Sequence, residues 1–345
     1  MIKFKNLLWV LTFAICTYIL YLILDYYKGN IQTLYVKAVF ESYRRVWDVL
    51  FSKSPIPLTL IWLGLLLLLL IYWSVLWKKN KWKWHNGIYG FIFIFCIHYI
   101  WFYWTWGFNY TRVDPWIVKP VKDSVFYLEM NDHIEYISKL RASIDMKTKN
   151  FNKREFEIEI RESLRNYLNI YGINAVGNPR CRYLYPSGSL LVWSAAGIYI
   201  PFSGESLMDP GLHTLAQAFT IPHELAHAFG VTHEAVCNFI AYKVCHQSPD
   251  PLIRYVAAFN YLKYLLADFR RINPNQYKRI FENLHPLVKT DLLEVHKQHD
   301  SYPEFIPAIR SWIYDRYLKS HGMPEGEFTY HQMVSLVIHD KYKTK

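Results

Sequence analysis

The stretch from residue 223 to residue 227 carries the residue types from which proteins build hydrolytic metal sites. His223 and His227 are four residues apart, so on a helix both imidazoles project from one face and can converge on one ion. Zinc suits two such nitrogens at about 2.0–2.1 Å each. Glu224 follows the first histidine, and its carboxylate is placed to accept a proton from an attacking water. The His-Glu-x-x-His spacing therefore predicts zinc-dependent hydrolysis.

The surroundings of this motif predict a buried helix that ends at a glycine. The neighbouring residues are small or apolar: Leu225, Ala226, Ala228 and Phe229. Buried histidines and glutamates need a partner that offsets their desolvation, and a cation can do so. On an unbroken helix Glu234 would lie about 10 Å beyond His227 along the axis, which is too far to share an ion. We therefore expect the helix to end at Gly230 and a second helix, capped by Thr232, to begin at His233.

Two residues compete as the third ligand. Glu234 opens the run EAVCNFIA, which resembles the Glu-x-x-Ala-Asp ligand helix of gluzincin-type membrane proteases, and Asn238 would then orient a ligand histidine. His233 instead completes His-Glu-x-x-His-x-x-Gly-x-x-His, the metzincin spacing, for which Met323 would have to supply the downstream methionine turn. We favour Glu234 and keep His233 as the alternative.

The elements that must position these residues begin with a membrane region, 1–106. Three apolar segments in it are long enough to span a bilayer: 7–24, 58–77 and 88–106. The first is read as an uncleaved anchor, because no small-residue cleavage site follows it. His98 lies inside the third, where we expect a neutral histidine hydrogen-bonded to a neighbouring helix. Residues 31–51 predict an amphipathic helix that lies on the outer membrane face or packs on the domain.

Charge and composition indicate orientation and partners. Lysine and arginine are denser in the N-terminus and in the linker 78–87 than in the loop 25–57, which predicts a cytoplasmic N-terminus and an extracytoplasmic region 107–345 in a multi-pass cytoplasmic-membrane protein. Aromatic residues make up 18% of the chain and the net charge is +11, which suits a lipid bilayer as partner. No nucleic-acid-binding motif accompanies the charge. Five cysteines are too few for a disulfide scaffold, so Cys181, Cys237 and Cys245 are expected to be reduced packing residues.

Residues 107–345 have the mixed pattern of a globular domain. Amphipathic or buried helices are predicted at 132–145, 154–172, 213–245, 250–272, 275–299 and 305–322, and short strands within 182–205. The predicted fold class is mainly α with a small β element.

Several long motifs in order resemble one known family. They are WTWGFNYTR (104–112), AAGIYIPFSGES (195–206), PHELAHAFG (222–230), NFIAYKVC (238–245), LVKTDLLEVH (287–296) and YDRYLKSHGMPEG (314–326). The chain is similar to the domain-of-unknown-function 3810 family of bacterial integral membrane proteins. This resemblance implies three transmembrane helices followed by a gluzincin-like, zincin-fold metallopeptidase domain that holds Zn²⁺ and cleaves a peptide or protein substrate. Val236 stands where that family usually carries a second acid, and Cys237 where it carries alanine. The alternative is accordingly a non-catalytic membrane scaffold with a degenerate or structural metal site.

The same resemblance gives a role to residues 197–205, GIYIPFSGE, which precede the metal motif. They would form an edge strand beside the cleft, able to pair with an extended peptide; a buried structural strand that ends in a glycine turn is the equal alternative. Tyr199 and Glu205 are candidates to contact substrate or a ligand residue. The oxyanion of the intermediate needs a further donor, for which Tyr199, Tyr242 and His213 stay open.

Overall fold

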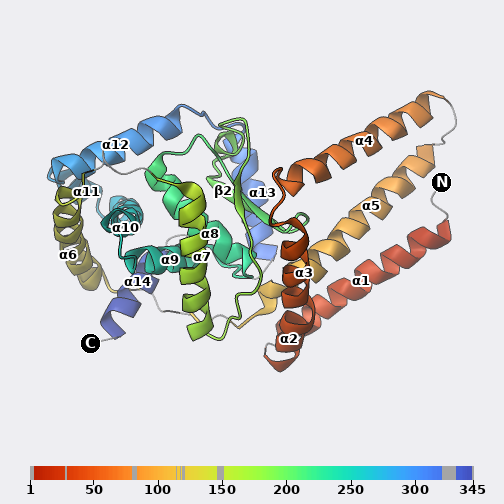
Figure 1. The fold of residues 1–345 in the computed structure, drawn as a ribbon, viewed down its shortest axis with the longest axis horizontal. Coiled ribbons are helices and arrows are strands. Elements are labelled where there is room, and N and C mark those ends of the chain that lie inside the picture. Colours follow the sequence, from red (N-terminus) through yellow and green to blue (C-terminus); the bar gives the residue numbers. More distant parts are fainter. Residues whose placement is uncertain are drawn as a thin grey trace. The chain divides into compact units, whose positions relative to one another are not determined.

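The computed structural model describes residues 4–27, 29–79, 84–113, 115–116, 118, 121–145, 151–320 and 332–343. They form many helices and one small sheet (Figure 1), which confirms the predicted mainly α class. The chain divides into two compact units. Unit 1 contains residues 1–113, 176–179 and 200–205, and unit 2 contains residues 114–175, 180–199 and 206–345.

Unit 1 contains three helices that are long and apolar enough to cross a membrane. They are α1 (Phe4–Tyr26), α4 (Leu58–Lys78) and α5 (Trp84–Thr105). Each matches a predicted span to within a few residues. Only 6% of the apolar window of α4 is buried by protein, so its leucines need an apolar solvent, and lipid is such a solvent. The chain therefore has the character of a membrane protein.

Contacts between these helices are aromatic and polar. α1 and α5 pack along each other, with Tyr21 against Tyr103. α4 meets α5 where Trp62 Nε1 donates to His98 Nε2 at 3.1 Å. The other nitrogen, His98 Nδ1, lies 2.8 Å from the carbonyl of Ile94. Because the indole can only donate, this pairing requires the neutral Nδ1–H tautomer of His98. The predicted hydrogen bond between His98 and a neighbouring helix is confirmed.

The segment that follows α1 is helical, but its last helix buries charged residues and exposes apolar ones. It comprises α2 (Asn30–Tyr35), a π-helical turn (Val36–Phe40) and α3 (Glu41–Phe51), in place of the single regular helix predicted for 31–51. Arg44 and Asp48 of α3 are buried, whereas Val46 is 61% and Val49 is 81% exposed. Arg44 pairs with both carboxylate oxygens of Asp48, at 2.7 and 2.8 Å. The polar face of α3 therefore faces protein and its apolar face does not.

Unit 2 is built around α10 (Pro251–Ile272), which is buried along most of its length. It packs against α6 (Asp123–Ala142), α8 (Thr214–Ala228), α9 (Glu234–His246), α11 (Pro274–Glu282) and α14 (Gln332–Lys343). α7 (Lys153–Ile170) packs against both α8 and α9. Among the described residues, two short 3₁₀ helices occur at Gly107–Thr111 in unit 1 and at Leu191–Trp193 in unit 2. The sequence did not predict α14.

One predicted helix is two helices. The single helix predicted for 275–299 is wrong, because α11 ends at Glu282 and α12 runs from Pro286 to Asp300. Pro286 cannot sit inside a helix without breaking its hydrogen bonds, but it suits the first turn of a new one. α13 (Pro307–Ser320) follows. Met323, the candidate for a methionine turn, lies outside the described residues.

The sheet of three strands precedes α8. Its order is β1 (Cys181–Tyr183), β3 (Glu205–Met208), β2 (Gly197–Ile200), with β1 parallel to β3 and Cys181 opposite Ser206. Only residues 201–204 connect β2 to β3, so these two form an antiparallel hairpin, since a parallel connection needs many more residues. β2 is an edge strand of this sheet, and Gly204 in the turn has φ +62°. The single edge strand expected for 197–205 is instead a strand and a turn, because β2 ends at Ile200 and Glu205 already belongs to β3.

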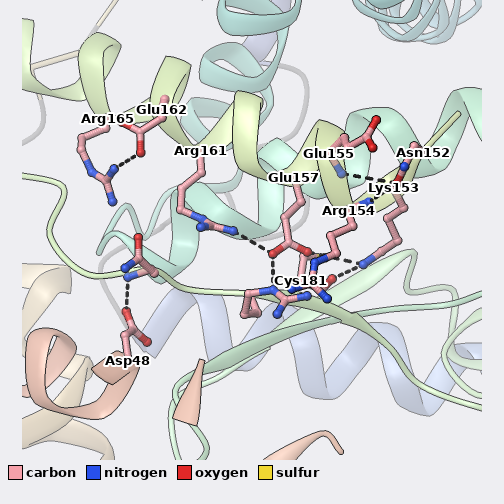
Figure 2. A network of polar contacts seen from close by, with 12 residues as sticks. Asp48, Asn152, Lys153, Arg154, Glu155, Glu157, Arg161, Glu162, Arg165 and Cys181 are labelled. Atoms are coloured by element: carbon pink, nitrogen blue, oxygen red, sulfur yellow. Dashed lines mark hydrogen bonds and ion pairs between the residues drawn. The ribbon is translucent and has the colours of Figure 1, made fainter. Parts of the chain in front are cut away.

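A buried carboxylate of α7 is part of a polar network at the start of β1 (Figure 2). Glu157 is 1% exposed and accepts from Arg161 at 2.9 Å and from Arg180 at 2.5 Å. Lys153 Nζ lies 3.5 Å from its other oxygen and also donates to the carbonyl of Cys181. Three cations thus offset the burial of one carboxylate. All five cysteines of the chain are free, and Cys181, Cys237 and Cys245 are buried.

Candidate metal centre

The candidate ligands come from two helices that meet at a glycine turn. α8 ends at Ala228, and Gly230 has φ +89°, a conformation that glycine adopts without steric cost. The amide of Gly230 donates to the carbonyl of His227 at 2.9 Å, and that of Val231 to the carbonyl of Ala226 at 3.1 Å. These two bonds define a Schellman motif. The predicted helix end at Gly230 is confirmed.

The second helix begins one residue later than predicted. α9 starts at Glu234, and its N-cap is His233, whose side chain makes no capping bond to the helix. The prediction of Thr232 as the cap is therefore wrong. The shift places Glu234 at the first helical position, where an anionic side chain faces the positive end of the helix dipole.

Three side-chain atoms converge at this corner. His223 Nε2 lies 3.2 Å from His227 Nε2 and 3.2 Å from Glu234 Oε2, and His227 Nε2 lies 3.4 Å from the same oxygen. Three atoms bound tetrahedrally to one zinc ion at 2.0–2.1 Å would lie about 3.3–3.4 Å apart. The triangle in this chain has nearly these edges. Among the described residues, these three form the group with metal-ligand geometry.

The Nδ1 atoms of both imidazoles are hydrogen-bonded, and these bonds orient the Nε2 atoms toward one another. His223 Nδ1 lies 2.8 Å from Asn238 Oδ1 of α9, and His227 Nδ1 lies 2.8 Å from the carbonyl of Val231. Because both partners are acceptors, each Nδ1 carries its hydrogen, and each Nε2 presents a lone pair. Asn238 thus occupies the orienting position expected from the sequence, while the Val231 carbonyl is supplied by the glycine turn.

Two lone pairs and a carboxylate oxygen that face one another repel unless a cation lies between them, either a metal ion or a proton on one imidazole, and Glu234 together with Cys237 raises the pKa of His227 against the effect of its burial. Burial alone would raise the pKa of Glu234, but the two histidines hold that pKa well below its usual range. The side chains of Glu234 and His227 are 13% and 9% exposed, so little water screens them. A divalent ion fits this donor set by number, geometry and charge.

Glu224 lies on the same helix, beside the triangle. It is 4% exposed, and its Oε2 has no hydrogen-bond partner among the described residues. Burial raises the pKa of its carboxyl to about 7, and the nearby histidines reduce that rise. Gly197 of β2 packs directly on it, since a Cβ there would stand 2.6 Å from Glu224 Oε1. Ser206 Oγ donates to the backbone carbonyl of Glu224 at 2.8 Å.

The other predicted site residues have different surroundings. Glu205 Oε1 accepts from the amide and the hydroxyl of Thr59, at 2.8 and 2.9 Å. Tyr199 is a buried residue of β2. The ring of Tyr242 stacks on His246, and His213 Nδ1 accepts from the amide of Leu215 at the start of α8.

Tyr264 of α10 is a tyrosine on which the charge of Glu234 acts, and the sequence analysis did not single it out. It is partly buried, and burial together with the negative charge of Glu234 raises the pKa of its hydroxyl. Tyr264 is therefore neutral at physiological pH and can donate a hydrogen bond. Its position 30 residues beyond Glu234, on a helix with no motif of its own, left no local signal in the sequence.

A comparison with known protein families matches residues 35–338 to the family described as Protein of unknown function (DUF3810). The chain belongs to this family. The matched region of the DUF3810 family includes α4, α5, the sheet and every residue of the candidate metal centre. Comparisons with curated proteins and with solved structures found no match.

Proposed function

We propose that this DUF3810 protein is a membrane-anchored, zinc-dependent metallopeptidase of gluzincin type. His223, His227 and Glu234 would hold the ion, with His233 outside the ligand set. The observation that supports this most strongly is the triangle of two lone-pair nitrogens and one carboxylate oxygen with edges of 3.2–3.4 Å. The alternative, a scaffold whose metal site is structural, uses the same three ligands but needs no buried carboxylate beside them.

Under this proposal the metal ion and Glu224 divide the chemistry of peptide hydrolysis between them. A bound Zn²⁺ would supply a Lewis acid that polarises the scissile carbonyl and lowers the pKa of a water molecule. Glu224, whose Oε2 has no partner among the described residues, would accept a proton from the attacking water and deliver it to the leaving amine.

Tyr264 joins Tyr199, Tyr242 and His213 as a candidate donor to the oxyanion. Glu234 influences its hydroxyl electrostatically, and within the described part of the chain no hydrogen bond engages that hydroxyl. Tyr242 and His213 are already committed to a ring stack and a helix cap. Removing one such donor typically costs about 10²–10³-fold in turnover.

The proposed location is the cytoplasmic membrane, with the N-terminus inside and residues 107–345 outside. Three crossings put the two ends of the chain on opposite sides. The density of lysine and arginine in the N-terminus and in 78–87 favours the cytoplasm for both. Reporter fusions after residue 82 and after residue 345 would test it, since only the second should report an extracytoplasmic end.

The function is tested with purified full-length protein and its Glu224→Gln variant. Zinc is measured by elemental analysis, and hydrolysis with a labelled protein substrate such as casein and with a mixed fluorogenic peptide library. We expect stoichiometric zinc in both proteins and hydrolysis in the wild type only, reduced about 10²–10⁴-fold by the substitution. Zinc in both proteins with hydrolysis in neither would favour the scaffold, and no zinc in either would reject both.

A further inference from the structure

Helix α13 of unit 2 exposes an apolar face. Ile309, Trp312 and Ile313 are 55%, 63% and 55% exposed, and their spacing of three and four residues puts them on one side of the helix. Among the α13 side chains that the structure describes, none is fully buried, and the half-buried ones are polar: Arg310, Ser311 and Asp315. The helix therefore keeps polar side chains against the protein and leaves apolar ones without cover.

The exposed apolar residues continue into the segment before α13. Phe305 is 56% exposed, and its ring meets the ring of Trp193 edge-on, with centroids 5.4 Å apart and planes at 80°. Trp193 is itself 47% exposed. The amide of Phe305 donates to the carbonyl of Val192 at 2.6 Å, so the backbones of the two segments are joined as well.

The loop that carries Trp193 is firmly held. Asp209 is fully buried, and its carboxylate accepts three backbone amides of residues 188–191 at 2.8–3.2 Å. The ring of Tyr302 packs against Gly188, where a Cβ would stand 2.5 Å from a ring carbon. The exposure of Trp193 is therefore a property of a fixed surface.

α13 lacks the protein contacts that usually stabilise a helix of its length. It has 14 residues, and helices this short are marginally stable in water without a packed apolar face. Clustered apolar residues on a surface mark an interaction site. We therefore expect an apolar partner to cover this face.

Chain connectivity brings a bilayer within reach of this surface. α5 is long and apolar enough to cross a membrane, and residues 106–113 join it to unit 2. Even fully extended, this connection measures only about 30 Å. Such a short tether keeps the effective concentration of the membrane surface high, so a weak affinity suffices for binding.

The composition of α13 suits an anionic lipid surface. Its sequence contains three basic residues, Arg310, Arg316 and Lys319, and one acidic residue, Asp315. The guanidinium of Arg316 lies 5.8 Å from the ring centre of Trp312. Tryptophan and basic residues beside aliphatic ones are typical of helices that lie in the membrane interface.

We propose that α13, together with Trp193 and Phe305, binds the surface of an anionic lipid bilayer. The apolar face enters the boundary between headgroups and acyl chains by about 5–10 Å, and Arg316 binds lipid phosphate. This surface is a second attachment to the membrane, in addition to the spanning helices. It does not depend on the proposed hydrolysis.

The test measures the depth of this face in full-length protein in lipid nanodiscs. A nitroxide is attached at Ile313→Cys in a Cys16→Ala background, because Cys16 is exposed and the other four cysteines are buried. Lys278→Cys, at an exposed position of α11, carries the control label. Power saturation compares collisions with oxygen, which partitions into lipid, and with a water-soluble nickel chelate.

We expect the label at residue 313 to collide with oxygen but not with nickel, at a depth of about 5–10 Å. The label at residue 278 should report water. Trp312→Gln should raise the nickel collisions of the first label to the level of the control. Nickel collisions equal to the control in the unmodified face would overturn the proposal. A label shielded from both reagents would also overturn it, because protein and not lipid would then cover the face.

The lipid composition tests the role of Arg316. In discs that contain phosphatidylglycerol, Arg316→Gln should lower the ratio of immersed to released label about fivefold, because one basic side chain near an anionic surface is lost. In discs of phosphatidylcholine alone, the same substitution should change little. Equal ratios with and without Arg316 in the anionic discs would overturn the assigned contact with lipid phosphate.

Discussion

The identity of the third ligand is the most direct test of the candidate centre. Glu234→Ala removes the oxygen that lies 3.2 and 3.4 Å from the two histidine nitrogens. Losing a partner that only orients a ligand typically weakens metal binding by about 10–100-fold. The loss of a ligand atom itself should exceed that range. We therefore expect zinc affinity to fall by more than about 100-fold, or roughly 2.7 kcal/mol.

His233→Ala is the matched comparison, because the two residues are adjacent and only one belongs to the triangle. His233 precedes α9 as its N-cap, and its side chain makes no capping bond to that helix. Its substitution should change zinc affinity by less than about threefold, near the limit of what a competition assay resolves. Affinity is measured against a chromophoric chelator, with circular dichroism to show that both variants keep their helices. A large loss in His233→Ala with little change in Glu234→Ala would refute the geometry and favour the metzincin spacing.

Three further predictions follow from the same region and from the core. Gly230→Ala puts a side chain at φ +89° and should cost about 1–2 kcal/mol, seen as a lower melting temperature and weaker zinc binding. Asn238→Ala frees the outer nitrogen of His223 and should weaken zinc binding about 10–100-fold in the same chelator assay. Burial of His133 lowers its pKa to about 4, so the unfolded chain takes up a proton first and stability is lost as pH falls from 6.5 to 4. The loss should be about 3 kcal/mol at the lower end and absent in His133→Gln; equal acid sensitivity of the two proteins in thermal melts would contradict it.

Local rules of geometry made part of this molecule predictable. The three spans follow from length and apolar composition, and the helix end from a glycine between two apolar turns. The position of His223 and His227 on one face of a helix follows from their spacing of four residues. The break at Pro286 was equally visible in the sequence, because proline starts helices and does not continue them. It was missed because the apolar pattern on both sides of it has the same period.

Contacts between residues far apart in the sequence could not be predicted from the sequence alone. Glu205 and Thr59 are 146 positions apart, and no local pattern shows that an acidic residue near the metal motif caps a membrane helix. The buried Arg44–Asp48 pair reverses the polarity that its helix would have as an isolated amphipathic segment. Tyr264 likewise depends on how α10 packs against α9. In each case tertiary packing decides which side of an element is buried, and single-sequence periodicity cannot.

The turn between α8 and α9 makes the candidate centre sensitive to chain length more than to composition. Adding or deleting one residue between Ala228 and Glu234 would disrupt the Schellman turn at Gly230, which fixes where α9 begins, and would move the carboxylate of Glu234 away from the two histidines. The same change would withdraw the amide oxygen of Asn238 from His223. We therefore expect a one-residue insertion or deletion in this stretch to abolish metal binding, even where a single substitution would only weaken it.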